Sequence, residues 1–107
     1  RHSATRSLLE RRDVVIVDGP TTVRRIGTHE GLGRVSIDGQ PDDVLTLLPL
    51  AGPVEGVTTR DLRYPLAGET LVPGPARGLS NELLGTRASV TTLRGRLLVI
   101  HTRTAWR

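Results

Sequence analysis

Residues able to perform acid–base or metal chemistry are few and scattered in this sequence. The histidines, His2, His29 and His101, have no partner at the spacing of a metal site, and we interpret them as solvated or incidental. The acidic pair Asp42-Asp43 lies in a predicted turn, where aspartate is common for backbone reasons. Cysteine is absent, which excludes disulfides, thiolate metal ligands and cysteine nucleophiles. We therefore assign neither a catalytic residue nor a metal site to this chain.

One glycine-rich segment has a distant likeness to a phosphate-binding loop. Gly31-Leu32-Gly33 is followed neither by the pattern of an apolar helix nor by a Lys-Ser/Thr pair, which such loops require. We therefore predict a plain turn at these residues. Spacing also gives no basis for a serine–histidine–aspartate triad.

The composition bounds the fold and its core. A length of 107 residues suits one small domain with one core. Hydrophobic residues make up 36% of the chain and aromatic residues 2%, and phenylalanine and methionine are absent. The core must therefore consist of valine, leucine, isoleucine and alanine.

The charge and hydropathy patterns limit the partners. The net charge of +4 favours anions, but the 15 arginines are interspersed with 11 acidic residues. A nucleic-acid-binding module also needs exposed aromatic residues for stacking, and only Tyr64 and Trp106 are available. No apolar stretch approaches the ~18 residues of a membrane span. We predict no nucleic-acid partner and no membrane span, and the lack of cysteine favours a cytoplasmic protein.

A period-two pattern of apolar residues runs through most of the chain. Short segments with this pattern, separated by glycine- and proline-rich turns, predict an all-β fold, a jelly-roll-like β-sandwich. The strands that we expect are residues 14–17, 21–26, 34–37, 43–50, 54–59, 61–66, 69–72, 88–93 and 96–103. Residues 3–12 predict a short helix. We expect residues 1–12 to be the end of a preceding domain or a linker, and 13–107 to be the β domain.

Two stretches carry a specific resemblance. They are LLPLAGPVEGVTTRDLRYPL at residues 47–66 and GPARGLSNE at residues 74–82, followed by a last strand at 96–100. In this order they resemble the C-terminal, vitamin B1-binding domain of thiamine pyrophosphokinases. One departure is Asp61, which stands where the family commonly has glycine. If that glycine has a positive φ, aspartate tolerates the geometry better than most residues.

The resemblance implies a function for the complete enzyme. Members of the family transfer a pyrophosphoryl group from ATP to the hydroxyl of thiamine and use Mg²⁺. Their N-terminal α/β domain holds ATP, the metal and the catalytic carboxylates, whereas the C-terminal β domain contributes to the thiamine pocket and the homodimer. The resemblance thus implies thiamine as the ligand of this chain, with ATP and Mg²⁺ bound by the missing domain, and no activity of the chain alone.

The resemblance also implies thiamine-binding residues, for which structural roles remain open. Tyr64 could stack on a thiamine ring or pack against the sheet. Ser80 and Asn81 could bond the aminopyrimidine or hold the glycine-rich loop by bonding the backbone. Gly78 would allow close approach of the backbone to the ligand. A further alternative is a structural module that binds no thiamine and serves dimerisation.

Overall fold

The computed structural model describes residues 14–27, 31–74 and 79–104. All regular structure in this part of the chain is β-strand. The strands are β1 (Val14–Asp18), β2 (Thr21–Ile26), β3 (Gly33–Asp38), β4 (Val44–Arg60), β5 (Glu69–Leu71), β6 (Leu79–Glu82), β7 (Arg87–Thr92) and β8 (Arg94–Thr102). No membrane-spanning helix is found among these residues. The helix expected at residues 3–12 lies outside them.

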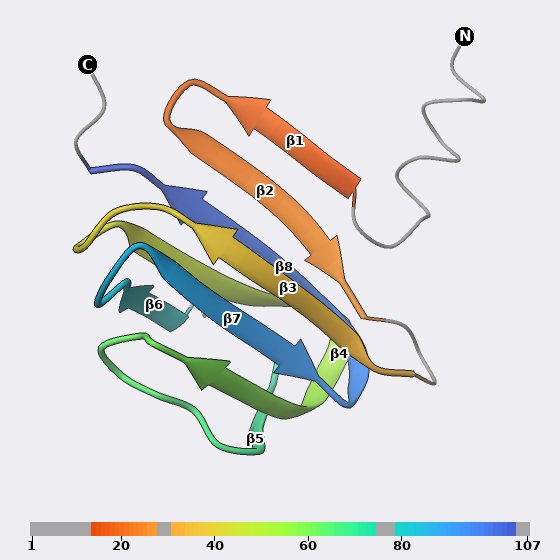
Figure 1. The fold of residues 1–107 in the computed structure, drawn as a ribbon. Helices are drawn as coiled ribbons and strands as arrows, with labels where there is room; N and C mark the ends of the chain where they lie inside the picture. The colour runs from red at the N-terminus through yellow and green to blue at the C-terminus, as the bar shows by residue number, and fades with distance from the viewer. Residues whose placement is uncertain (1–13, 28–30, 75–78, 105–107) are drawn as a thin grey trace, which may run out of the picture.

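The strands pair antiparallel throughout and form one curled sheet (Figure 1). The order is β1-β2-β8-β4-β7-β3, and β5 and β6 add to β4. Curling brings β3 against β2 and β8, which lie near the other end of this order. The all-β prediction is confirmed. The jelly-roll sandwich remains a prediction, because the pairing joins all the strands through β4.

Strand β4 connects the part of the sheet that contains β1, β2, β8 and β6 to the part that contains β7, β3 and β5. Its first half, from Val44, pairs with β8 and β6, and its last residues, up to Arg60, pair with β7 and β5. Ala51 and Gly56 have φ angles of 58° and 65°, and the register with β8 shifts between Leu50 and Glu55. Positive φ and a register shift bend a strand without ending its pairing. The two strands expected at 43–50 and 54–59 are therefore one bent strand.

The segment after β4 also differs from the sequence-based expectation. Residues 61–66 were expected to be a strand, but only Leu62 makes a bridge there, to Leu83. Asp61 has a φ of 64°, which turns the chain away from the extended direction. The outcome is an irregular segment, residues 61–68, that runs along the end of β6.

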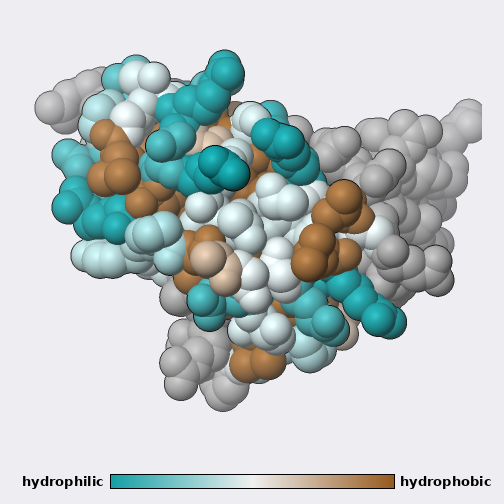
Figure 2. Space-filling model, turned by 60° about the horizontal axis from the view of Figure 1, so that its bottom comes forward, coloured by the Kyte–Doolittle hydropathy of each residue, from teal (hydrophilic) through white to brown (hydrophobic). Residues whose placement is uncertain are grey.

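The core contains the residue types that the composition requires. Its buried apolar side chains are Ile26, Val35, Ile37, Leu45, Leu47, Val54, Val57, Leu62, Leu83, Ala88, Val90, Leu97 and Val99. They alternate along the strands because successive strand residues face opposite sides of a sheet. Figure 2 shows that apolar surface on one side of the molecule forms separate patches bordered by hydrophilic groups.

Candidate functional site

Asn81 uses its side-chain amide to hold the backbone of a neighbouring segment. It is buried, with 5% exposed surface, and lies in β6 opposite Leu45 of β4. Its Nδ2 donates to the Tyr64 carbonyl at 2.7 Å, and its Oδ1 accepts from the Tyr64 amide at 2.9 Å. The same oxygen accepts from the Glu82 amide at 3.0 Å. Asn81 therefore fixes the backbone of Tyr64 through both its amide and its carbonyl group.

The side chain of Tyr64 lies at the surface. Tyr64 is 61% exposed although its backbone is bonded to a buried residue. An exposed aromatic ring on a fixed backbone can stack on a flat or cationic ligand with little loss of its own freedom. The structure thus provides a positioned aromatic face beside β6.

Arg63 ties the same segment to the charged groups around it. Its Nε donates to Glu82 Oε1 at 2.6 Å, and its Nη2 lies 3.2 Å from Asp42 Oδ1. Its backbone amide donates to the Glu82 carbonyl at 2.9 Å. The hydrogen bond to Glu82 is the main cause that raises the pKa of Arg63. Asp42 and Glu82 are therefore engaged in ion pairs, and each is less available as a metal ligand.

The two threonines of the first motif hold the other end of this segment. Thr59 Oγ1 accepts from the Leu66 amide at 2.9 Å, and Thr58 Oγ1 accepts from the Gly68 amide at 3.0 Å. Thr59 also donates its own amide to the Leu66 carbonyl at 2.9 Å. The Thr-Thr and Ser-Asn-Glu motifs, which lie far apart in the sequence, thus hold residues 61–68 between them. We call this segment the Tyr64 loop.

The remaining residues implied by the resemblance are placed differently. Ser80 is exposed and pairs with Thr46 of β4, and strand alternation directs it to the side of the sheet opposite Asn81. Gly78 lies outside the described residues. The structure therefore brings Tyr64 and Asn81 together, and it leaves Ser80 on another face.

A buried histidine–aspartate pair lies elsewhere in the fold. His101 Nε2 is 2.8 Å from Asp43 Oδ2, and the two residues are 5% and 1% exposed. The same carboxylate accepts from the Gln40 amide at 3.0 Å and from the Thr104 amide at 3.3 Å. Burial alone would raise the pKa of Asp43, but these hydrogen bonds and the charge of His101 together lower it. Asp43 is thus held as a carboxylate inside the protein.

Sequence reasoning missed this pair. It interpreted His101 as solvated or incidental and Asp43 as a turn residue, but both are buried. The residues are 58 positions apart, so spacing could not connect them. The available signal was the alternation in the last strand, where His101 follows Leu97 and Val99 at inward-facing positions.

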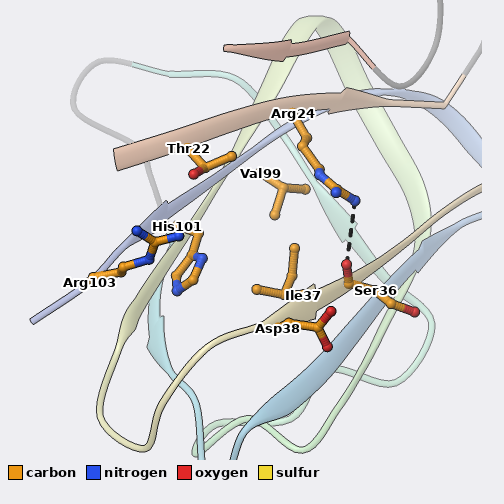
Figure 3. Close-up of a pocket in the computed structure, with 8 residues that line it drawn as sticks. All are labelled: Thr22, Arg24, Ser36, Ile37, Asp38, Val99, His101 and Arg103. Atoms are coloured by element: carbon orange, nitrogen blue, oxygen red, sulfur yellow. Dashed lines mark hydrogen bonds between the residues drawn. The ribbon is translucent and has the colours of Figure 1, made fainter. Parts of the chain in front are cut away.

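His101 also lines a cavity between β2, β3 and β8 (Figure 3). The cavity has a volume of about 200 Å³, and its charged lining residues besides His101 are Arg24, Asp38 and Arg103. Neither Tyr64 nor Asn81 lines it. Within the described ranges, no three histidine, aspartate or glutamate side chains lie close enough to share a metal ion.

The comparisons with known proteins agree with the sequence resemblance. The family model "Thiamin pyrophosphokinase, vitamin B1 binding domain" matches residues 34–97. The solved thiamine pyrophosphokinase from Bacillus subtilis has 17% sequence identity and a TM-score of 0.74, over 95% of this chain and 49% of its own length. The enzyme from Geobacillus thermodenitrificans has 21% identity and a TM-score of 0.73, over 97% and 48%. A search among curated proteins found no match.

The solved structures establish the fold, and the family model establishes the relationship. This chain spans about half the length of the solved relatives. The matched residues include both β4, where the Thr-Thr motif lies, and β6, where Asn81 lies. The resemblance inferred from the two motifs is confirmed, and the chain belongs to the family of vitamin B1-binding domains of thiamin pyrophosphokinases.

Proposed function

We propose that this chain forms the thiamine-binding part of an enzyme that transfers pyrophosphate from ATP to thiamine to give thiamine diphosphate. The observation that carries the proposal is the Tyr64 loop. Residues of both family motifs hold this loop in place, and its one aromatic ring faces solvent. A loop held in this way presents a preorganised surface, which lowers the entropic cost of binding a ligand.

Each thiamine-binding residue has a proposed role. Tyr64 stacks on the cationic ligand, because its ring is exposed and its backbone is fixed. Asn81 acts mainly by positioning Tyr64, since both ends of its amide already bond backbone groups. We keep Ser80 and Gly78 as proposed thiamine contacts on the family motif alone. Ser80 faces the side of the sheet opposite Asn81, so its exposed hydroxyl is assigned to a part of the ligand that Tyr64 does not contact, and Gly78 allows the backbone to approach.

The nucleotide and metal belong to the complete enzyme in this proposal. Mg²⁺ needs clustered oxygen ligands, and no cluster of three histidine or acidic residues is found in the part of the chain that the structure describes. Asp42 and Glu82 are paired with Arg63, and Asp43 is paired with His101. We therefore place ATP and Mg²⁺ on a separate catalytic domain, with residues 1–12 as its end or a linker and 13–107 as the thiamine-binding domain. We further propose that the enzyme is a cytoplasmic homodimer.

The proposal is tested by measuring thiamine binding calorimetrically in the complete protein that contains this chain. Tyr64→Ala should weaken binding by roughly 1–3 kcal/mol, because stacking and apolar contact are lost. Tyr64→Trp should retain binding, since it keeps an aromatic face. Leu93→Ala is a matched control, because Leu93 is also exposed, at 59%, and lies in the β7–β8 turn. Equal thiamine affinity in the wild type and in Tyr64→Ala would contradict the proposed role of Tyr64.

The same measurement separates the enzyme from a purely structural module. If the wild-type protein bound no thiamine at any pH near neutrality, the thiamine-binding assignment would be wrong. A dimer that persisted without thiamine binding would then favour the dimerisation module.

A further inference from the structure

The cavity between β2, β3 and β8 has the charge of an anion site. Arg24 reaches into it from β2, and Arg103 enters from the end of β8 (Figure 3). Among the described residues, neither arginine has a carboxylate within ion-pair distance. Arg24 donates to the Ser36 carbonyl at 3.4 Å, a long hydrogen bond that uses one of the five donors of a guanidinium group. Both cations therefore keep donors for a ligand.

The acidic residues at the cavity are already compensated. Asp38 lies at its edge and is bonded through Oδ1 to the Nε of Arg87 at 2.9 Å. Asp43 is buried behind His101 and accepts hydrogen bonds from His101, Gln40 and Thr104. Asp38 is thus paired with Arg87, and Asp43 does not line the cavity, so the unpaired charges among the lining residues are those of Arg24 and Arg103.

His101 adds an oriented imidazole ring to the cavity wall. Asp43 takes Nε2 of the imidazole at 2.8 Å, so the ring cannot rotate without breaking a buried hydrogen bond. Its other ring nitrogen has no hydrogen-bond partner in the described part of the chain, and the ring forms part of the cavity wall in Figure 3. The imidazole thus shapes the wall of the cavity, and a neutral ring that donates through Nε2 has only a lone pair at its other nitrogen.

The backbone around the pair is shaped for close packing. A Cβ atom on Gly39 would lie 2.6 Å from Asp43 Oδ2 and 2.8 Å from His101 Nε2. Only a glycine lets the chain pass so close to the pair. The position of the imidazole at the cavity wall is thus fixed by its hydrogen bond to Asp43 and by packing against the backbone of Gly39.

We propose that this cavity binds a small phosphate-class oxyanion, with Arg24 and Arg103 as its ligands. Charge-assisted hydrogen bonds from arginine suit the geometry of phosphate oxygens. The volume of about 200 Å³ is below the ~300–1,000 Å³ of sites for drug-sized ligands, so a phosphate group fits and a whole nucleotide does not. Because Tyr64, Ser80 and Asn81 do not line the cavity, the site is separate from the proposed thiamine site.

The test is a titration of the isotope-labelled protein with inorganic phosphate, followed by heteronuclear NMR in a phosphate-free buffer at constant ionic strength. We expect saturable shifts confined to residues around the cavity, such as Thr22, Arg24 and His101. Glycerol 3-phosphate forms a second arm, which distinguishes a phosphate ester from free phosphate. Saturable binding of either compound at the cavity supports the proposal, and the tighter one identifies the source of the phosphate group.

Substitutions decide whether the named side chains are the ligands. Arg24→Gln and Arg103→Gln should each weaken phosphate binding roughly fivefold to tenfold, because each removes charge-assisted hydrogen bonds. Arg60→Gln is the matched control, since it removes the same charge from an exposed position of β4 outside the cavity. Linear, unsaturated shifts in the wild type, or equal weakening by all three substitutions, would overturn the proposal by showing a nonspecific effect of charge.

Discussion

The side-chain amide of Asn81 forms two hydrogen bonds with the backbone of Tyr64, as a residue of a neighbouring strand would do. The amide donates to the Tyr64 carbonyl at 2.7 Å and accepts from the Tyr64 amide at 2.9 Å. The segment after β4 is irregular, so its backbone groups lack a full strand partner. Asn81 supplies this partner from β6, and it does so from a buried position.

Replacing Asn81 by alanine should therefore affect stability and thiamine binding together. The change leaves partly buried backbone groups of Tyr64 and Glu82 without their protein partner, and such a group costs up to about 1–3 kcal/mol. We expect a loss of roughly 2–4 kcal/mol in the free energy of unfolding in urea, and weaker thiamine binding with little change in ATP affinity. Ser80→Ala is the neighbouring control for stability alone, which it should leave nearly unchanged because Ser80 is exposed. A stable Asn81→Ala protein with normal thiamine affinity would rule out the positioning role.

Asp61 occupies a backbone conformation that favours glycine. Its φ is 64°, in the left-handed region, and it stands where the family commonly has glycine. Asp61→Gly should leave the free energy of unfolding unchanged or raise it slightly, whereas Asp61→Val should lower it by about 1–2 kcal/mol, because a β-branched residue is strained there. Urea unfolding of both variants checks this. Equal stability of the two variants would argue that φ at this position does not limit the fold.

Stability should fall at acidic pH through Asp43. The folded protein lowers the pKa of this carboxyl below its unfolded value of about 3.9. A lowered pKa contributes stability above the unfolded pKa, and this stability is lost as the pH falls through the folded pKa. The free energy of unfolding should thus decline below pH ~4, and the decline should be shallower in Asp43→Asn. Asp18→Asn is a charge-matched control at the exposed end of β1. An unchanged profile in Asp43→Asn would assign the acid sensitivity to other carboxyls.

Gly39→Ala should disturb the Asp43–His101 pair. The added Cβ would lie 2.6 Å from a carboxylate oxygen of Asp43, below ordinary contact distance. We expect a loss of about 1–3 kcal/mol in stability, as for other insertions into packed sites. Gly85→Ala is the control, because a Cβ on Gly85 would meet nothing within 4 Å. The His101 ring signals in NMR should shift in Gly39→Ala and stay in place in Gly85→Ala. If both variants behaved alike, close packing at Gly39 would not matter.

The sequence predicted the fold class well because strands leave a local signal. Period-two alternation and turn residues marked most strands, and the absence of phenylalanine and methionine defined the core. The continuity of β4 was not predictable, since Gly52-Pro53 reads locally as a turn. Here Ala51 and Gly56 absorb the bend, and cross-strand pairing keeps the strand intact.

The candidate sites were predictable only in part, for a related reason. Family motifs pointed to Tyr64 and Asn81, but they did not reveal that the two residues bond each other. The Asp43–His101 pair arises from residues 58 positions apart and depends on strand register. Strand register is set by the packing of the whole sheet. A local sequence pattern therefore cannot predict which distant side chains will be in contact.

The strand order has a consequence for how the protein is made. β2 pairs with β8, with Thr21 opposite Thr102. The β1–β2 hairpin is therefore synthesised well before the strand that pairs with it. At about 5–20 residues per second, a ribosome needs roughly 4–15 seconds to synthesise the intervening chain. During this interval the β1–β2 hairpin exposes an unpaired edge that can pair with other nascent chains. The β1–β2 hairpin can therefore gain its neighbour only once β8 is complete, and truncation within β8 should leave this edge open to aggregation.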